Sequence, residues 1–103
     1  MSFRVSSAAA PTHFELSQNT PNPFNPTTRI EYQLPRSVHV RLMIYNVQGQ
    51  EVRRLVDVEQ QVGVYRVEWN GLNDAGKPVA SGIYLYRLQA DEFTQTRKMM
   101  LVR

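Results

Sequence analysis

The chain has 103 residues, of which 42% are apolar and 20% are charged, and this length and composition are typical of a single globular domain. It contains no cysteine, which excludes a disulfide framework and any metal site built on thiolates. The formal net charge of +3 is modest and the 12 basic residues are spread along the chain, a pattern typical of a solvated surface, so nucleic acid is not expected as a partner.

The N-terminal segment differs from the rest of the chain. Residues 1–12 are small and polar, show no periodicity and end near Pro11, which indicates a linker from a preceding module. They lack the apolar core of a secretory signal, and no apolar run in the chain approaches the roughly 20 residues of a membrane-spanning helix. We therefore expect the folded domain over residues 13–103 and no transmembrane segment.

The next part of the chain predicts strands separated by a proline-rich loop and a turn. A short strand is expected over residues 13–16, and strands with clear alternation are expected over residues 28–34 and 38–45. The side chains expected to face the core are Ile30, Tyr32, Leu34, Val38, Val40, Leu42 and Ile44. Those expected on the outer face of the strand over residues 38–45 are His39, Arg41 and Met43.

The second half of the chain continues the β pattern. After a turn at Gly49, residues 51–58 predict a weaker strand whose adjacent arginines indicate an edge position. A strand over residues 64–69, a long loop rich in turn-forming residues, and a hairpin of strands over residues 83–90 and 93–102 complete the chain. The large residues expected to fill the core are Tyr32, Trp69, Tyr84 and Tyr86.

These elements together indicate the fold class. No stretch shows the 3.6-residue periodicity of a helix over three turns, whereas about seven short strands punctuated by Gly, Pro and Asn turns are typical of a β-sandwich. The sequence therefore predicts an all-β fold, an immunoglobulin-like antiparallel sandwich of about seven strands. With no cysteine pair, such a sandwich depends on core packing alone.

One loop comes close to a phosphate-binding motif without completing it. Residues 71–77 fit the spacing G-x-x-x-x-G-K, which must be followed by a Ser or Thr and by a helix whose N-terminus faces the phosphates. Here Pro78 supplies no hydroxyl, and the segment that follows is a predicted strand. The pattern indicates a loop shaped by glycines, and no nucleotide cofactor is expected.

Candidates for metal binding and catalysis are sparse. Asn70, Asn73 and Asp74 carry oxygen ligands, but calcium prefers several carboxylates and Asx residues in turns usually bond their own backbone, so calcium is a weak alternative. His13 and His39 are the only histidines, too few for a zinc site without cysteine. The serines and glutamates show no nucleophile–base arrangement, so we expect no enzyme, no cofactor and no metal.

Carbohydrate binding is the main competing function, as an accessory module of a polysaccharide-degrading enzyme. Sandwich modules bind sugars on exposed aromatic rings. The candidate rings are Tyr45, Tyr65, Trp69, Tyr84 and Tyr86. Alternation groups Tyr84 and Tyr86 with Leu88, which favours a core role for these two and leaves Tyr45 and Tyr65 as possible sugar platforms.

Two motifs are more informative together than alone. The first is QNTPNPFNPTTRIEYQLP followed by VRLMIYNVQGQEVRRLV, and the second is WNGLNDAGKPVASGIYLYRLQADEFTQTRKMMLVR. Together they resemble the C-terminal sorting domains (type A) of the type IX secretion system, found on proteins exported across the outer membrane of Bacteroidetes-related bacteria. The second motif is also similar to the immunoglobulin-like domain of the flagellar hook-capping protein, whose matching loop usually has an aspartate where this chain has Asn70.

The resemblance implies a non-catalytic secretion and surface-attachment signal on a protein exported through the periplasm and outer membrane, to be secreted or held at the cell surface. In this family the translocon recognises the domain, a sortase-like peptidase removes it, and the cargo is attached to surface lipopolysaccharide or set free. Cleavage in the linker would fall within residues 5–13. The positions that match the family's recognition motifs are Asn22, Pro23, Phe24, Asn25, Gly82, Tyr84, Lys98, Leu101 and Arg103.

The proline-rich loop has a structural interpretation beside the recognition one. Proline fixes its own φ and restricts the residue before it, so Asn22 and Asn25 are also stiffened. We expect Phe24 to fold back over one end of the sandwich, as a cap, as a contact for the secretion machinery, or as both. A monomer ending on the apolar strand that leads to Arg103 is expected; the third interpretation is an assembly domain of the hook-cap kind that packs through a strand edge.

Overall fold

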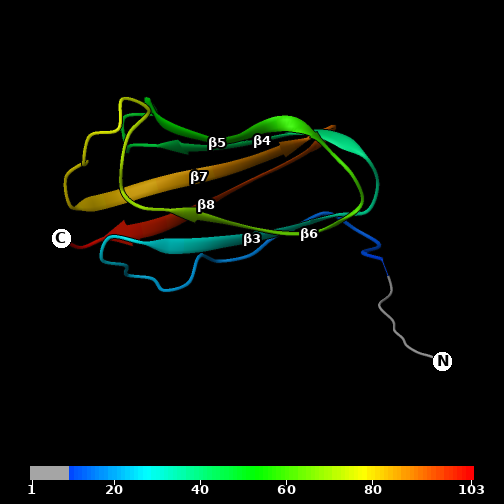
Figure 1. The fold of residues 1–103 in the computed structure, drawn as a ribbon, viewed down its shortest axis with the longest axis horizontal. Helices are drawn as coiled ribbons and strands as arrows, with labels where there is room; N and C mark the ends of the chain where they lie inside the picture. Colours follow the sequence, from blue (N-terminus) through cyan, green and yellow to red (C-terminus); the bar gives the residue numbers. More distant parts are fainter. Residues whose placement is uncertain (1–9) are drawn as a thin grey trace.

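The computed structural model describes residues 10–103, and these form seven strands in two antiparallel sheets that face each other (Figure 1). The expected linker over residues 1–12 and cleavage segment over residues 5–13 fall largely outside the described residues. One sheet has the order β2 (Glu15–Leu16), β3 (Thr28–Leu34), β6 (Gly63–Trp69). The other has the order β5 (Glu51–Gln60), β4 (Val38–Tyr45), β7 (Gly82–Ala90), β8 (Phe93–Leu101). Among residues 10–103, no helix is long and apolar enough to cross a membrane.

The predicted fold class is confirmed, and the strand bounds differ only at some ends. β3 and β4 match their predicted ranges, and β5 lies at a sheet edge as predicted. The first strand, expected from residue 13, contains only Glu15 and Leu16, and the preceding Phe14 stacks on Phe93 at a centroid distance of 5.3 Å. A tertiary contact of this kind has no signature in local alternation.

The core lies between the two sheets and contains the residues predicted for it. Every side chain expected to face inward from β3 and β4 is at most 3% exposed. The predicted large core fillers Tyr32, Trp69, Tyr84 and Tyr86 are all buried, and Trp69 contacts the ring of Tyr84 edge-on at 5.4 Å. Such interdigitated aromatic packing replaces the disulfide that braces many domains of this class.

Met43 departs from the prediction that it points to solvent. It lies on the face of β4 opposite the core and outside the core cluster, as alternation requires, yet it is only 4% exposed. Its partners across the two neighbouring strands are Arg54 and Arg87. Arginine stems bury apolar neighbours while their guanidinium groups stay wet, so an outward methionine between two arginines becomes covered.

Candidate functional site

The proline-rich segment runs along the outer edge of β8, and we call residues 17–27 the strap. The peptide bonds before its three prolines are cis. The backbone N–H of Phe24 donates to the carbonyl of Met100 (3.0 Å), and the N–H of Val102 donates to the carbonyl of Phe24 (2.9 Å). The side-chain oxygen of Asn22 accepts from the N–H of Met100 (2.9 Å). The strap therefore satisfies backbone groups that an edge strand would otherwise leave open.

Two further contacts extend this cover along β8. The amide of Gln18 donates to the carbonyl of Lys98 (2.8 Å), and Nε of Arg97 donates to the carbonyl of Leu16 (2.7 Å). Together with the Phe24 and Asn22 bonds they cover the β8 edge from Lys98 to Val102.

A buried polar network fixes the strap to the sandwich. The hydroxyl of Tyr86 donates to the carbonyl of Ser17 (2.6 Å) and accepts from the N–H of Asn19 (2.8 Å). The amide of Asn19 donates to the Thr28 hydroxyl (2.9 Å), which donates to the carbonyl of Pro21 (2.8 Å). Burial raises the pKa of Tyr86 to about 12, because the phenolate is disfavoured there. Sequence reasoning missed Asn19 and Thr28, which are at most 2% exposed.

Phe24 closes one end of the core, as the sequence predicts. It is 2% exposed, and its ring lies 5.7 Å from that of Trp69. A contiguous row of aromatic side chains thus runs from the strap through Trp69 to Tyr84, whose hydroxyl donates to the carbonyl of Ala80 (2.7 Å). Proline stiffness and ring burial act together here, because the restricted strap loses less entropy when Phe24 is placed.

Arg103 holds the long loop before β7 against the strap. Its Nε donates to the carbonyl of Val79 (2.6 Å), its Nη2 donates to the carbonyl of Gly71 (2.7 Å), and its backbone N–H donates to the Ser81 hydroxyl (2.9 Å). Gly71 has a φ of +78°, and a Cβ at this position would lie 2.7 Å from Nη2 of Arg103 and 3.4 Å from Pro26. The backbone conformation therefore favours glycine there, and any Cβ would push the Arg103 guanidinium away from its bond to the Gly71 carbonyl.

We expect Gly71→Ala to lower the free energy of unfolding by about 2–3 kcal/mol, since the new methyl group displaces the Arg103 guanidinium from the Gly71 carbonyl in addition to the cost of a left-handed non-glycine residue. Gly76→Ala is the matched control: its φ is +77°, but nothing lies within 4 Å of its Cβ position. We expect a loss of about 1 kcal/mol for that control. Urea unfolding followed by Trp69 fluorescence measures both, and equal losses would show that the Arg103 contact contributes nothing.

Most of the sequence-predicted recognition residues converge on this end of the sandwich, and they divide into two groups. Those that hold the structure together, through burial, pairing or hydrogen bonds, are Asn22, Phe24, Gly82, Tyr84, Leu101 and Arg103. Those whose side chains are exposed and form no hydrogen bond or ion pair among residues 10–103 are Pro23, Asn25 and Lys98. Gly82 pairs with Leu101 at a φ of +153° and has open space over its Cβ position.

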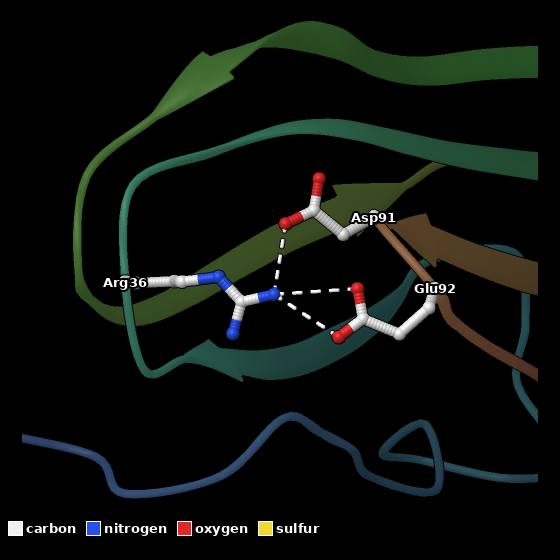
Figure 2. A network of polar contacts seen from close by, with 3 residues as sticks. All are labelled: Arg36, Asp91 and Glu92. Carbon is white, nitrogen blue, oxygen red and sulfur yellow. Dashed lines mark hydrogen bonds and ion pairs between the residues drawn. The ribbon is translucent and has the colours of Figure 1, made fainter.

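The opposite end of the sandwich carries a second cluster, where the described chain begins. Nη2 of Arg36 donates to Asp91 (2.9 Å) and to both carboxylate oxygens of Glu92 (3.1 and 3.3 Å), as Figure 2 shows. These bonds raise the pKa of Arg36, the Asp91 bond contributing most. The same guanidinium lies 5.1 Å from the ring of Phe14, which stacks on Phe93. The cluster joins the entering chain to the β3–β4 and β7–β8 turns.

The loop that resembles a calcium or phosphate site has its polar groups engaged. The side-chain oxygen of Asn73 accepts from the N–H groups of Ala75 and Lys77 (both 3.0 Å), and that of Asp74 accepts from the N–H of Arg54 (3.0 Å). Among residues 10–103 there is no group of three or more His, Cys, Asp or Glu side chains arranged to hold a metal ion. These Asx oxygens act as caps of the loop and of the β5 edge.

The aromatic candidates for sugar binding lie mostly in the core. Trp69, Tyr84 and Tyr86 are at most 7% exposed, so no sugar can stack on them. Tyr65 lies parallel to Tyr32 at 5.5 Å, and Arg87 covers Tyr45 at 5.0 Å. Three of the five candidates are therefore buried, and one ring face of each of the other two is already occupied.

Comparison with known proteins places this arrangement among immunoglobulin-like domains. A family model described as the FlgD Ig-like domain matches residues 17–92, which include the strap but not β8. A search of curated proteins found no match.

Similar solved structures include dimeric latent PorU from Porphyromonas gingivalis (TM-score 0.70, 21% identity, covering 97% of this chain and 10% of that one). They also include PorZ, described as an essential bacterial surface component of the type IX secretion system of P. gingivalis (TM-score 0.59, 19% identity, covering 87% and 11%). FLGD from P. aeruginosa is similar too (TM-score 0.56, 24% identity, covering 72% and 58%). At these identities the likeness concerns the fold, and this chain spans about a tenth of the length of PorU and of PorZ.

Proposed function

This chain belongs to the FlgD Ig-like domain family, and from that premise we propose that residues 13–103 act as a C-terminal sorting domain of the type IX secretion system. Residues 1–12 then form the linker from a preceding cargo module. The domain performs no catalysis: the translocon binds it, and a sortase-like peptidase cuts the linker within residues 5–13. The cargo is thereby secreted or left at the cell surface, attached to lipopolysaccharide.

The observation that carries this proposal is the junction of the strap with β8. Phe24 lies in the first of the two sequence blocks that resemble the sorting family and Leu101 lies at the end of the second, yet these two residues are bridge partners in the structure. A receptor that binds this end of the sandwich meets both blocks as one surface. The resemblance in fold to PorZ, a surface component of the type IX system, supports the same context.

The division of the motif residues suggests which of them a receptor contacts. Buried Phe24 and Leu101 are inaccessible in the folded domain, so their role is to build the surface. The exposed side chains of Pro23, Asn25 and Lys98 lie on or beside the same junction and are the proposed contacts. Exposed polar residues on a rigid scaffold are the usual carriers of recognition.

A reporter fusion tests the proposal. Residues 14–103 fused behind a periplasmic reporter are expected to send it out of a cell with a working type IX system and to leave it in the periplasm of a strain that lacks the translocon. The matched control is the same fusion with Asn25→Ala and Lys98→Ala. These changes preserve every bond described above, because the Lys98 contact uses its backbone carbonyl, but they remove two proposed receptor contacts and should therefore reduce export. Retention of the unaltered fusion in the competent cell, while an established signal exits, would contradict the proposal.

A further inference from the structure

The two sheets have four edge strands, and three of these edges are protected against pairing with another chain. The strap and Gln18 cover the second half of β8, from Lys98 onward, and β2 is only two residues long. The pairing of β5 with β4 contains two register shifts, and Asp74 bonds the outer edge of β5 at Val52 and Arg54 (both 3.0 Å). Short strands, bulges and plugs are the means by which proteins block edge-to-edge association.

The fourth edge, that of β6, has none of these protections. Its pairing with β3 runs from Gly63 to Trp69 without a register shift, and among residues 10–103 no hydrogen bond reaches its outer edge. Its charges are already paired within the sheet, because Arg66 bonds Glu31 (3.0 Å) and Glu68 lies opposite Arg29. β6 therefore presents a regular row of unpaired backbone N–H and C=O groups.

Exposed apolar side chains gather on the same side of the molecule. Val58 on β5, Val62 in the connection and Val64 on β6 are 51%, 44% and 49% exposed. β5 and β6 are the edge strands away from β8, because β8 contacts the strap and the β2 segment through Gln18 and Arg97. A chain that adds to β6 thus reaches this apolar corner as well.

We propose that β6 pairs antiparallel with β6 of a second copy of this chain, about a twofold axis at Val67. Residues that face each other across an antiparallel pair point to the same side of the sheet, so an outward residue must face an outward residue. With Val67 opposite Val67, Arg66 of each copy faces Glu68 of the other. A twofold interface uses the same patch twice, so this one arrangement satisfies both pairs.

The existing charges of the sheet continue across this interface. Arg29 lies opposite Glu68 within one copy, Glu68 then faces Arg66 of the second copy, and that Arg66 bonds its own Glu31. The outer face gains two rows of alternating sign, and each opposite-charge pair across strands is favourable. On the inner face Tyr65 of each copy faces Trp69 of the other.

Neighbouring registers lack this complementarity. An axis at Arg66 brings two arginines face to face, and an axis at Glu68 does the same with two glutamates; like charges directly opposite destabilise a sheet. An axis at Tyr65 leaves Arg66 opposite Val64 and Glu68 opposite Val62. The charge pattern of β6 therefore selects the axis at Val67. The proposed dimer replaces the monomer that we expect from the sequence.

A charge-exchange experiment tests the pairing. We expect the unaltered chain to associate reversibly into dimers as its concentration rises in sedimentation equilibrium. Arg66→Glu alone and Glu68→Arg alone each turn both opposite-charge pairs into like-charge pairs, and we expect each to weaken association about ten- to thirtyfold. An equimolar mixture of the two variants restores opposite charges at both pairs, so we expect it to associate about as tightly as the unaltered chain.

Lys98→Glu is the matched control for Arg66→Glu. It makes the same charge change on the covered part of the β8 edge and should leave association unchanged. Thermal unfolding followed by Trp69 fluorescence verifies that each variant is folded. An unaltered chain that stays monomeric at all concentrations, or a mixture no better than the single variants, would overturn the proposal.

Discussion

Phe24→Ala is expected to lower the free energy of unfolding by about 4 kcal/mol, because it removes a fully buried ring and leaves a cavity beside Trp69. Domains of this size are stable by only about 5–15 kcal/mol, so the variant would retain only about 1–11 kcal/mol. Urea unfolding followed by far-ultraviolet circular dichroism measures the loss. Phe24→Leu, which keeps most of the apolar volume, is expected to cost about 1 kcal/mol and to stay folded.

The same position separates structure from recognition in the export assay. Phe24→Leu should preserve export, because the ring is only 2% exposed and has little surface for a receptor to touch. Asn25→Ala is the comparison variant. Because its side chain is exposed, it should be neutral for stability to within about 0.5 kcal/mol, but as a change at a proposed receptor contact it should reduce export. A folded Phe24→Leu domain that fails to export, with Asn25→Ala exporting normally, would contradict the division of the motif residues drawn here.

Raising the pH above 10 is expected to remove about 5 kcal/mol of stability through two buried tyrosines. Burial raises the pKa of Tyr32 and of Tyr86 from 10.0 to about 12. The unfolded chain therefore releases these protons first. The stabilisation is complete below pH 10 and is lost as the pH rises to about 12, about half of it through each tyrosine.

Urea unfolding at a series of pH values from about 9 to about 12, with tyrosinate absorbance recorded in parallel, measures this loss. Tyr86→Phe is the informative variant. It is less stable at neutral pH, because the carbonyl of Ser17 and the N–H of Asn19 lose their hydrogen-bond partner. The free energy of unfolding that it loses at alkaline pH should be about half that lost by the unaltered chain. Titration of Tyr32 and Tyr86 themselves near pH 10 in the folded protein would refute the expectation.

Local sequence pattern predicted the parts of the fold in which alternation and burial agree. β3 and β4 were placed to the residue because each alternates between polar and apolar side chains along its length, and Gly49 marks the turn after them. The cover over Met43 was not predicted, since it depends on which strands lie next to β4 and on the length of the side chains they carry. Sheet order is a long-range property that no short window contains.

The sequence predicted which residues belong to the candidate site but not how they contact one another. The proline block and the terminal motif pointed to Phe24 and Arg103, but nothing in the sequence showed that Phe24 bonds the backbone on either side of Leu101. Asn19 was overlooked because a polar residue in loop sequence usually faces water, whereas here its N–H bonds the hydroxyl of Tyr86, which is distant in the chain. Thr28, the first residue of β3, was overlooked because alternation does not show that the strap supplies partners for its hydroxyl. An Asn or Asp next to a proline-rich block is the sequence feature that could have indicated such a buried anchor.

The cover on the β8 edge also has a consequence for the order of events during synthesis. The bonds that close it span 78 to 81 positions of the chain, from Leu16, Gln18 and Asn22 to residues in the last strand. A nascent domain cannot seal this flank until its final strand has left the ribosome, and loops of such length close slowly. The exit of β8 from the ribosome thus sets the earliest moment at which this edge of the sandwich can close.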